Sequence, residues 1–239
     1  MLEALTDIVY PPHCIVCERS LHDQEDPNLC SQCMAELPLV GDPSCRKCGH
    51  ELATHATIRA RCRACQGKSL FFKVASAPFK YETSARDLIL RLKLARQTSL
   101  APPLAEHLIS HIESLDIIPA IDVIIPVPLH WRRYCRRGYN QAMLLARPIS
   151  RHFGIPLLRR CLRRTAATRS QTSFNMEERM ENLRGAFAVR KNGMLKGKSV
   201  LLIDDVLTTG ATCNECSRIL MQDGSADAVY VVTVARTML

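Results

Sequence analysis

Residues 200–212 read VLLIDDVLTTGAT, an apolar run that leads through two adjacent carboxylates and a hydroxyl-rich loop into a helix. In an α/β fold, ligands bind at the carboxyl ends of the strands, so Asp204 and Asp205 are predicted to lie at a strand tip. Backbone amides of the loop, the positive end of the following helix and the threonine hydroxyls form a cradle for a phosphate dianion. The carboxylates can accept hydrogen bonds from two neighbouring ribose hydroxyls. The stretch therefore predicts a site for a phosphorylated ribose.

Strands and helices alternate on both sides of this stretch. Runs of apolar and β-branched residues predict strands at residues 76–81, 121–127, 199–203 and 228–235. Apolar residues at helical spacing predict a helix capped by Ser84, a second with Pro102 in its first turn, and others at about 140–153 and 212–221. Asn175 and Glu178 form a capping box for a further short helix. This alternation specifies an α/β domain with a parallel sheet, expected over residues 73–239.

Eight of the 12 cysteines form four pairs in which two residues separate the thiols: Cys14 and Cys17, Cys30 and Cys33, Cys45 and Cys48, and Cys62 and Cys65. Two such pairs can hold one zinc ion in a tetrahedral four-thiolate site, so the pattern predicts two structural zinc ions. Sequential pairing needs only local hairpins and is favoured, while a cross-braced arrangement would join the first pair to the third. Metal binding is expected to supply much of the folding free energy of this module, residues 1–72, because it has few apolar residues. The neighbouring histidines are interpreted as surface residues: His13, His22, His50 and His55.

The net charge of +9 is unevenly distributed along the chain. Residues 126–190 hold 14 basic and 3 acidic side chains, a local charge of +11, and the flanking regions are close to neutral. Such a segment favours an anionic partner. The sequence shows neither a basic, apolar leader nor a long apolar run, so we expect a cytoplasmic protein without membrane insertion.

The strand, acidic pair and threonine-rich loop of residues 200–212 resemble the signature of the phosphoribosyltransferases. The resemblance implies that Asp204 and Asp205 contact the ribose hydroxyls of 5-phosphoribosyl 1-pyrophosphate (PRPP). It also implies that Mg²⁺ accompanies PRPP. The residues implied around the 5′-phosphate are Thr208, Thr209, Gly210, Ala211 and Thr212.

A second run, PVPLHWRRYCRRGYNQ at residues 126–141, is similar to the ComF family, also called the GntX family. Members join a cysteine-rich zinc ribbon to a phosphoribosyltransferase domain, and several are required for natural transformation, the internalisation of single-stranded DNA. The resemblance implies that Arg136, Arg137 and Gly138 contribute to a pyrophosphate loop and that Arg169 lies in a hood that closes over PRPP. Single-stranded DNA and a DNA-translocating helicase are the macromolecular partners that it implies.

Two functions follow from these patterns. The first is a PRPP-binding protein that acts in natural transformation, and the second is an active phosphoribosyltransferase that transfers ribose 5-phosphate to an unidentified acceptor. Purine phosphoribosyltransferases usually place an aspartate where this chain has Thr208, so the sequence indicates a donor without an acceptor. Trp131 lies among arginines and can stack a nucleic acid base, although the basic segment can also serve the phosphates of PRPP alone. The remaining cysteines are interpreted as structural: Cys135, Cys161, Cys213 and Cys216.

Overall fold

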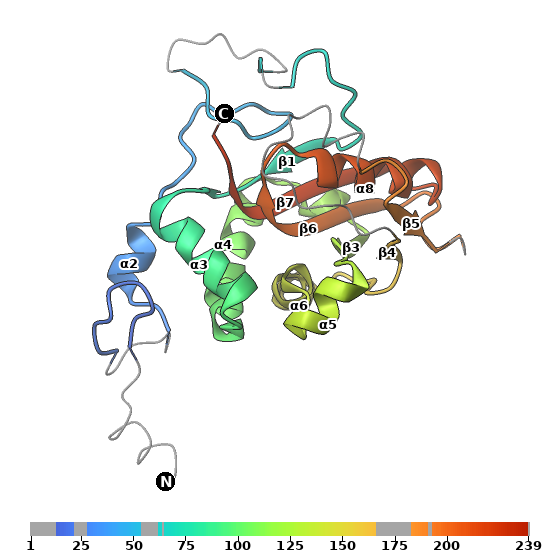
Figure 1. Ribbon diagram of the computed structural model, residues 1–239. Helices are drawn as coiled ribbons and strands as arrows, with labels where there is room; N and C mark the ends of the chain where they lie inside the picture. The colour runs from blue at the N-terminus through green and yellow to red at the C-terminus, as the bar shows by residue number, and fades with distance from the viewer. Residues whose placement is uncertain are drawn as a thin grey trace.

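The centre of the structure is a parallel sheet with the strand order β1, β7, β6, β3 (Figure 1). The computed structural model describes residues 13–21, 28–53, 62–63, 65–165, 183–190 and 193–238. The strands are β1 (Val74–Ser76), β7 (Ala228–Arg236), β6 (Ser199–Leu207) and β3 (Val123–Pro126), and β2 (Phe79–Lys80) pairs with the end of β7. The predicted α/β class with a parallel sheet is confirmed.

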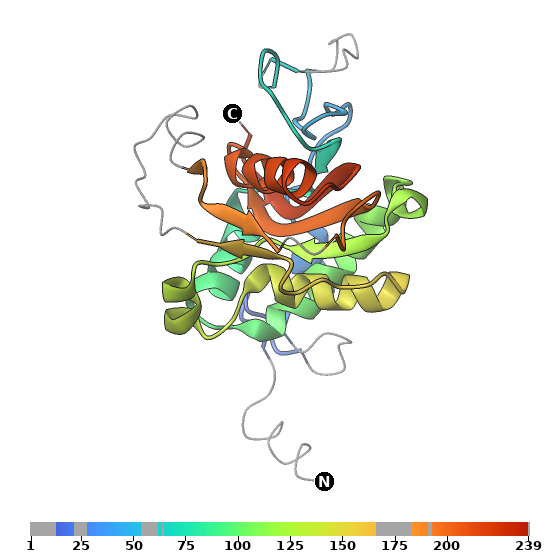
Figure 2. The same cartoon turned by 90° about the vertical axis from the view of Figure 1, so that its right-hand side faces the viewer.

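Helices cover both faces of this sheet (Figure 2). One face carries α3 (Thr83–Leu94), α4 (Ala101–Ser114) and α6 (Gln141–Phe153), and the opposite face carries α8 (Ala211–Gln222). The shorter elements are η1 (Thr98–Leu100), η2 (Ile118–Ala120), α5 (Trp131–Arg137) and an antiparallel hairpin of β4 (Leu162–Arg164) and β5 (Phe187–Val189). Because both faces are covered, the central strands are apolar along most of their length instead of alternating.

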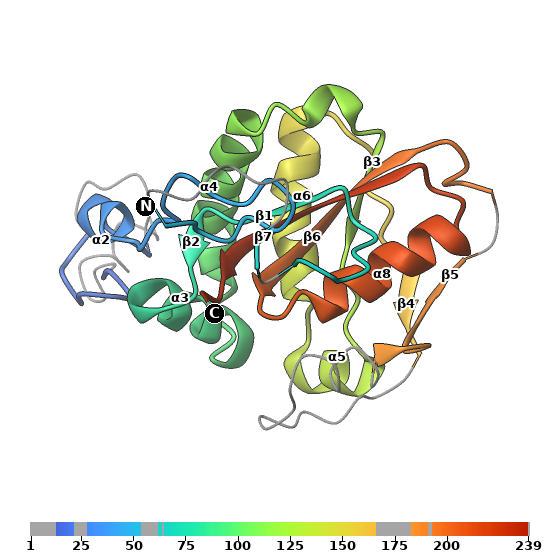
Figure 3. The ribbon, with the colours of Figure 1, turned by 90° about the horizontal axis from the view of Figure 1, so that it is seen from above.

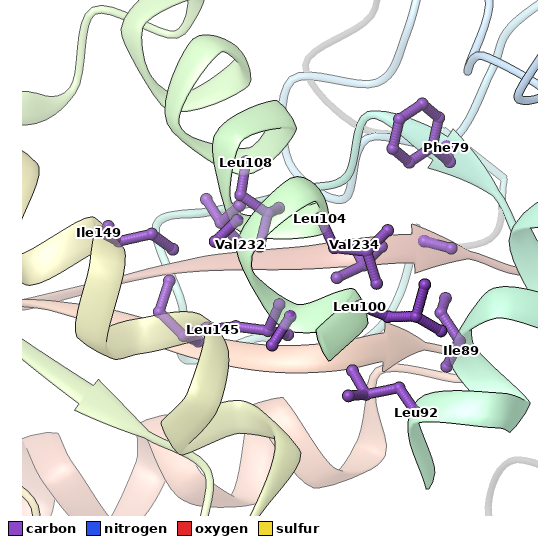
Figure 4. Close-up of a cluster of buried hydrophobic side chains, with 14 of the residues drawn as sticks. Phe79, Ile89, Leu92, Leu100, Leu104, Leu108, Leu145, Ile149, Val232 and Val234 are labelled. Atoms are coloured by element: carbon purple, nitrogen blue, oxygen red, sulfur yellow. The ribbon is translucent and has the colours of Figure 1, made fainter. Parts of the chain in front are cut away.

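A large apolar cluster joins the sheet to α3, α4 and α6 (Figure 4). Val232 and Val234 of β7 lie among Leu92, Leu108 and Leu145 from the three helices, and all of these side chains are buried. Full burial of one such side chain contributes about 1.5–3 kcal/mol. This layer therefore holds the end of α3 firmly against the sheet, at the point where β6 carries its acidic pair.

The cysteine-rich segment packs on the α/β domain at two places. Its first part includes α2 (Ser31–Ala35), which lies beside α3 (Figure 3), and its Leu29 and Leu37 belong to the core that α3 and α4 share. Its second part runs along β1, where the amide of Ala75 donates to the carbonyl of Lys47 at 2.9 Å. The segment therefore takes part of its apolar core from the larger domain, in keeping with its own few apolar residues.

Several boundaries differ from the sequence-based expectation. The predicted strand at 76–81 is divided into β1 and β2, with Pro78 between them, because proline has no amide to donate to a strand ladder. Helix α3 begins at Thr83 after the cap residue Glu82, so the prediction of Ser84 as the cap is wrong. Strand β6 continues to Leu207, and α5, β4 and β5 were not predicted. The capping box of Asn175 and Glu178 lies outside the described residues.

Candidate functional site

The acidic pair lies inside β6 and not at its tip, because the strand continues for two residues beyond it. Successive strand residues point to opposite faces of a sheet. Asp205 turns towards α3, where its Oδ1 lies 2.8 Å from Lys93 Nζ. Asp204 turns towards α8, where its charge raises the pKa of the Cys213 and Cys216 thiols beyond the rise caused by their burial. The two carboxylates are therefore held in different surroundings.

Burial disfavours the negative charge of this carboxylate pair. Asp205 Oδ2 is buried and has no hydrogen-bond partner among the described residues. Burial and then the charge of Asp205 raise the pKa of Asp204 to about 7, although Lys93, the Asp205 amide and Arg164 oppose the rise. That amide donates to Asp204 Oδ1 at 2.9 Å. A ligand that donates hydroxyl hydrogen bonds would satisfy the buried acceptor, as the ribose prediction requires.

The predicted phosphate loop connects β6 to α8. Gly210 has φ 76° and directly precedes the first turn of α8, so the loop ends in a left-handed residue that glycine adopts without strain. Thr209 Oγ1 accepts a hydrogen bond from the amide of Ala211 at 3.3 Å, and Thr208 is exposed. The loop amides and the positive end of a 12-residue helix thus meet here. Thr212 lies half-buried in the first turn.

The predicted pyrophosphate residues lie at the end of α5. Gly138 ends this helix with φ 87°, and Arg136 is exposed. Arg137 is half-buried, and its Nη1 donates to Gln141 Oε1 at 2.5 Å. Burial lowers the pKa of Arg137, while the charge of Asp205 opposes that shift, so this guanidinium lies within electrostatic range of Asp205. Arg169 lies outside the described residues.

The eight cysteines of the four pairs form two separate clusters, Cys14, Cys17, Cys30 and Cys33 in the first and Cys45, Cys48, Cys62 and Cys65 in the second. The prediction of sequential pairing is confirmed, and the cross-braced alternative is excluded. Within each cluster the sulfur atoms all lie within 4.8 Å of one another. A tetrahedron with sulfur about 2.3 Å from zinc has edges of about 3.8 Å, and the sulfurs lie 3.8 Å apart for Cys17 and Cys30 and 3.5 Å apart for Cys48 and Cys62. Both clusters therefore fit a four-thiolate zinc ion.

The second cluster lies next to the predicted phosphate loop. A cavity of about 30 Å³ separates them, lined by Cys48 and Cys65 on one side and by residues 207–210 on the other. Arg236, at the end of β7, lines the same cavity and donates to the carbonyl of Cys48. Beyond the last cysteine of the cluster in the sequence, the amide of Phe71 donates to Asn214 Oδ1 of α8 at 2.7 Å. The zinc ribbon and the loop are thus neighbours through tertiary contacts.

Sequence reasoning missed Lys93 and Arg236, which act on the acidic pair and on the second cluster. A signal existed for Lys93, because it lies four residues after the buried Ile89 and so continues the buried face of α3. The interpretation of Cys213, Cys216 and Cys161 as buried structural residues is confirmed, and the same interpretation of Cys135 is wrong because this residue is exposed.

Comparison with known families matches this architecture. The double zinc ribbon domain matches residues 5–66, and the phosphoribosyl transferase domain matches residues 139–238. The chain is therefore a double zinc ribbon joined to a domain of the phosphoribosyltransferase class. Competence protein F of Haemophilus influenzae is 34% identical over 93% of this chain and 96% of its own length. The chain belongs to the competence protein F family, that is, the ComF family that its sequence resembles.

Two further relatives agree with this assignment. DNA utilization protein YhgH of Escherichia coli K12 is 32% identical over 94% of this chain and 90% of its own length. Competence protein ComFC of Bacillus subtilis is 27% identical over 89% of this chain and 85% of its own length. Among solved structures, adenine phosphoribosyltransferase of Saccharomyces cerevisiae aligns with 61% of this chain and 81% of its own, at 13% identity and a TM-score of 0.35. Across the described part of the chain, no helix is both long and apolar enough to cross a membrane.

Proposed function

We propose that this protein binds PRPP with Mg²⁺ and acts in natural transformation, in the internalisation of single-stranded DNA. The observation that carries the PRPP part is the buried, unsatisfied carboxylate of Asp205, placed on the same strand that leads into the Gly210 loop and the start of α8. The names of the relatives, two competence proteins and a DNA utilization protein, support the part that concerns DNA.

The proposed binding mode assigns the ribose, the 5′-phosphate and the pyrophosphate of PRPP to three different places in the fold. Asp204 and Asp205 accept hydrogen bonds from the ribose hydroxyls, and residues 208–212 surround the 5′-phosphate at the positive end of α8. Arg137, which lies within electrostatic range of Asp205, and Arg136 bind the pyrophosphate, aided by the amide of Gly138. Mg²⁺ accompanies the pyrophosphate and offsets its charge. Arg169 belongs to the same proposal, as a residue that closes over the ligand.

Calorimetric titration with PRPP and Mg²⁺ tests this proposal. The variant in which Asp204→Asn and Asp205→Asn are combined should bind at least about tenfold more weakly, because each hydrogen bond to a charged acceptor contributes about 1.5–3 kcal/mol. Asp227→Asn is the matched control, since it removes an exposed carboxylate from the position directly before the neighbouring strand β7. Absence of PRPP binding by the unmodified protein would overturn the proposal. Transformation assays with the same variants then ask whether the pocket serves DNA uptake.

The surface of α5 supports single-stranded DNA as a partner. None of its residues is buried, and Trp131 and Tyr134 are 62% and 51% exposed. The Arg132 guanidinium lies 5.4 Å from the centre of the Trp131 ring, and Arg133 and Arg136 lie on the same helix. Aromatic rings that stack bases and cations that bind phosphates are the usual elements of a single-strand site, at about 1–3 kcal/mol for each stacked base. A DNA-translocating helicase is the protein partner that we propose for the same role.

Trp131 is the only tryptophan of the chain, so its fluorescence reports on this surface directly. We expect an oligothymidine to quench it and the affinity to fall steeply with salt, since phosphate contacts release counterions. Fluorescence anisotropy of a labelled oligonucleotide should show weaker binding by the Trp131→Ala, Tyr134→Ala variant and unchanged binding by Leu39→Ala, an exposed leucine on the zinc ribbon side. Equal binding by all three proteins would refute α5 as the DNA surface.

Transfer to an acceptor is the second candidate function, favoured by the match to the phosphoribosyl transferase domain. In that reaction the bond from ribose C1 to oxygen breaks, pyrophosphate leaves with the electron pair, and the acceptor bonds to C1 and releases a proton. Thr208 offers no base for that proton, so bulk water would take it. Release of pyrophosphate in the presence of bases or amines supports this function, and no release with a broad panel excludes it. Either function places the protein in the cytoplasm, where its metal-site thiols stay reduced.

A further inference from the structure

Lys93 forms an ion pair with Asp205 of the acidic pair. It lies in a part of the chain that precedes residues 139–238, which match the phosphoribosyl transferase domain. It lies one residue before the end of α3, and its Nζ is 2.8 Å from Asp205 Oδ1. The side chains of Lys93 and Asp205 are 21% and 6% exposed, so this ion pair is largely removed from water. A partner removed from such a pair leaves the other charge buried and uncompensated.

The Asp205 carboxylate has one oxygen paired and one without a partner among the described residues. Lys93 is its only salt-bridge partner in the described part of the chain, and its second oxygen, Oδ2, is buried without a hydrogen-bond partner there. Lys93 therefore fixes one carboxylate oxygen, and the other keeps an unused capacity to accept a hydrogen bond. This is the arrangement that a hydroxyl donor needs, because the acceptor is oriented before the ligand arrives.

The end of α3 also holds the arginine segment. The Tyr139 hydroxyl donates to the carbonyl of Leu92, and Arg96 Nη2 donates to the carbonyl of Arg136 at 2.9 Å. These contacts lie on either side of Lys93 in the sequence. The same helix end thus sets the place of Asp205, proposed to bind the ribose, and of Arg136, proposed to bind the pyrophosphate.

We propose that Lys93 is a positioning residue of the PRPP site, which orients Asp205 for a ribose hydroxyl and offsets the charge of the acidic pair. This inference rests on the proposed binding of PRPP. It adds a residue from α3, outside the β6–α8 unit, to the residues on which affinity depends.

The charges around the pair set the pH dependence of this role. The charges that act on the pKa of Asp204 are those of Asp205 on its own strand, Lys93 on α3 and Arg164 on β4, and the charge of Asp204 in turn acts on the thiols of Cys213 and Cys216 on α8. The charge of Asp205 acts on Arg137 of α5. Because Lys93 lowers the pKa of Asp204, its removal should move the pH at which Asp204 ionises upward from about 7. As the pH is lowered, affinity for PRPP should therefore begin to fall at a higher pH than in the unmodified protein.

The test is calorimetry with PRPP and Mg²⁺ between about pH 6 and 8.5 on four proteins. Lys93→Met removes the charge, Lys93→Arg keeps it, and Arg91→Met removes a charge from an exposed position of the same helix. We expect Lys93→Met to weaken binding at least about tenfold near neutral pH, as loss of a hydrogen bond to a charged group implies. Its pH profile should shift upward, while Lys93→Arg recovers much of the affinity and Arg91→Met matches the unmodified protein. Titration of PRPP itself affects all four profiles alike.

A double-mutant cycle separates positioning from general stability. In the Asp205→Asn background, Lys93→Met should cost little further affinity, because Lys93 acts through Asp205. Unchanged binding by Lys93→Met, or equal losses in both backgrounds, would overturn the inference while PRPP binding by the unmodified protein stands. If the unmodified protein binds no PRPP, the proposed function fails instead. If the Lys93→Met variant folds poorly, the Lys93→Arg variant provides the test. An unshifted pH profile of PRPP affinity and full affinity would support positioning by the charge of residue 93. A loss of affinity as large as that of Asp205→Asn would refute it.

Discussion

Replacement of Arg236 by methionine is expected to weaken zinc at the second cysteine cluster and to leave the first cluster unchanged. Arg236 is 3% exposed at the end of β7, its Nη1 donates to the carbonyl of Cys48, and its Nη2 lies 3.4 Å from His50 Nδ1. Burial raises the pKa of the Cys48 thiol, and the amide of His50 and the charge of Arg236 oppose that rise. Arg236 therefore supports the ligands of this cluster from outside.

The magnitude follows from the hydrogen bond that is lost. A bond from a charged donor contributes about 1.5–3 kcal/mol, which corresponds to roughly a 10- to 100-fold change in a binding constant and equals the usual effect of groups that support metal ligands. The first cluster should keep its affinity, because it packs beside α3 and α4, away from Arg236.

Competition with a chromogenic chelator measures this difference. The unmodified protein should release two zinc ions at similar chelator concentrations, and the Arg236→Met variant should release one of them at a concentration about 10- to 100-fold lower. Arg46→Met is the control, since it removes an exposed charge from the loop between Cys45 and Cys48. Identical release curves for the Arg236→Met variant and the unmodified protein would refute the reasoning, as would an equal effect of Arg46→Met.

Three further predictions concern stability. Gly210→Ala should destabilise the protein by about 1–2 kcal/mol in chemical denaturation, because φ 76° strains a residue with a Cβ, and unchanged stability would contradict this conformation. Asp204→Asn should stabilise the protein above pH 7 and have little effect near pH 4. The reason is that the pKa of Asp204 is raised from 3.8 to about 7 in the folded state, so ionisation of Asp204 costs stability as pH rises through 7. Equal effects at both pH values would exclude the raised pKa. Burial lowers the pKa of His111 from 6.5 to about 4, so stability should fall as pH drops from 6.5 towards 4. His111→Gln should remove that slope in thermal unfolding followed across this pH range, and a slope that persists points to other groups.

Much of the architecture was predictable because it depends on local spacing. The residues 200–212 carry a strand, a turn and a helix start in one contiguous stretch, so the β6–α8 unit could be found without any distant contact. The cysteine pairs are equally local, and sequential pairing followed from the short loops between them. The boundaries were less certain, because Pro78 and the cap of α3 depend on neighbours that a sequence pattern does not show.

The amino-acid sequence by itself determined the class of fold, the two cysteine clusters and the position of the acidic pair along the chain. Only the tertiary structure decided what meets those residues: Lys93 at Asp205, Arg236 at Cys48, and the second cluster beside the phosphate loop. The physical reason is the separation along the chain over which each interaction acts. Turn and strand propensities act between residues a few positions apart, whereas a buried ion pair joins residues far apart in the chain, and the packing of helices on the sheet alone brings them together.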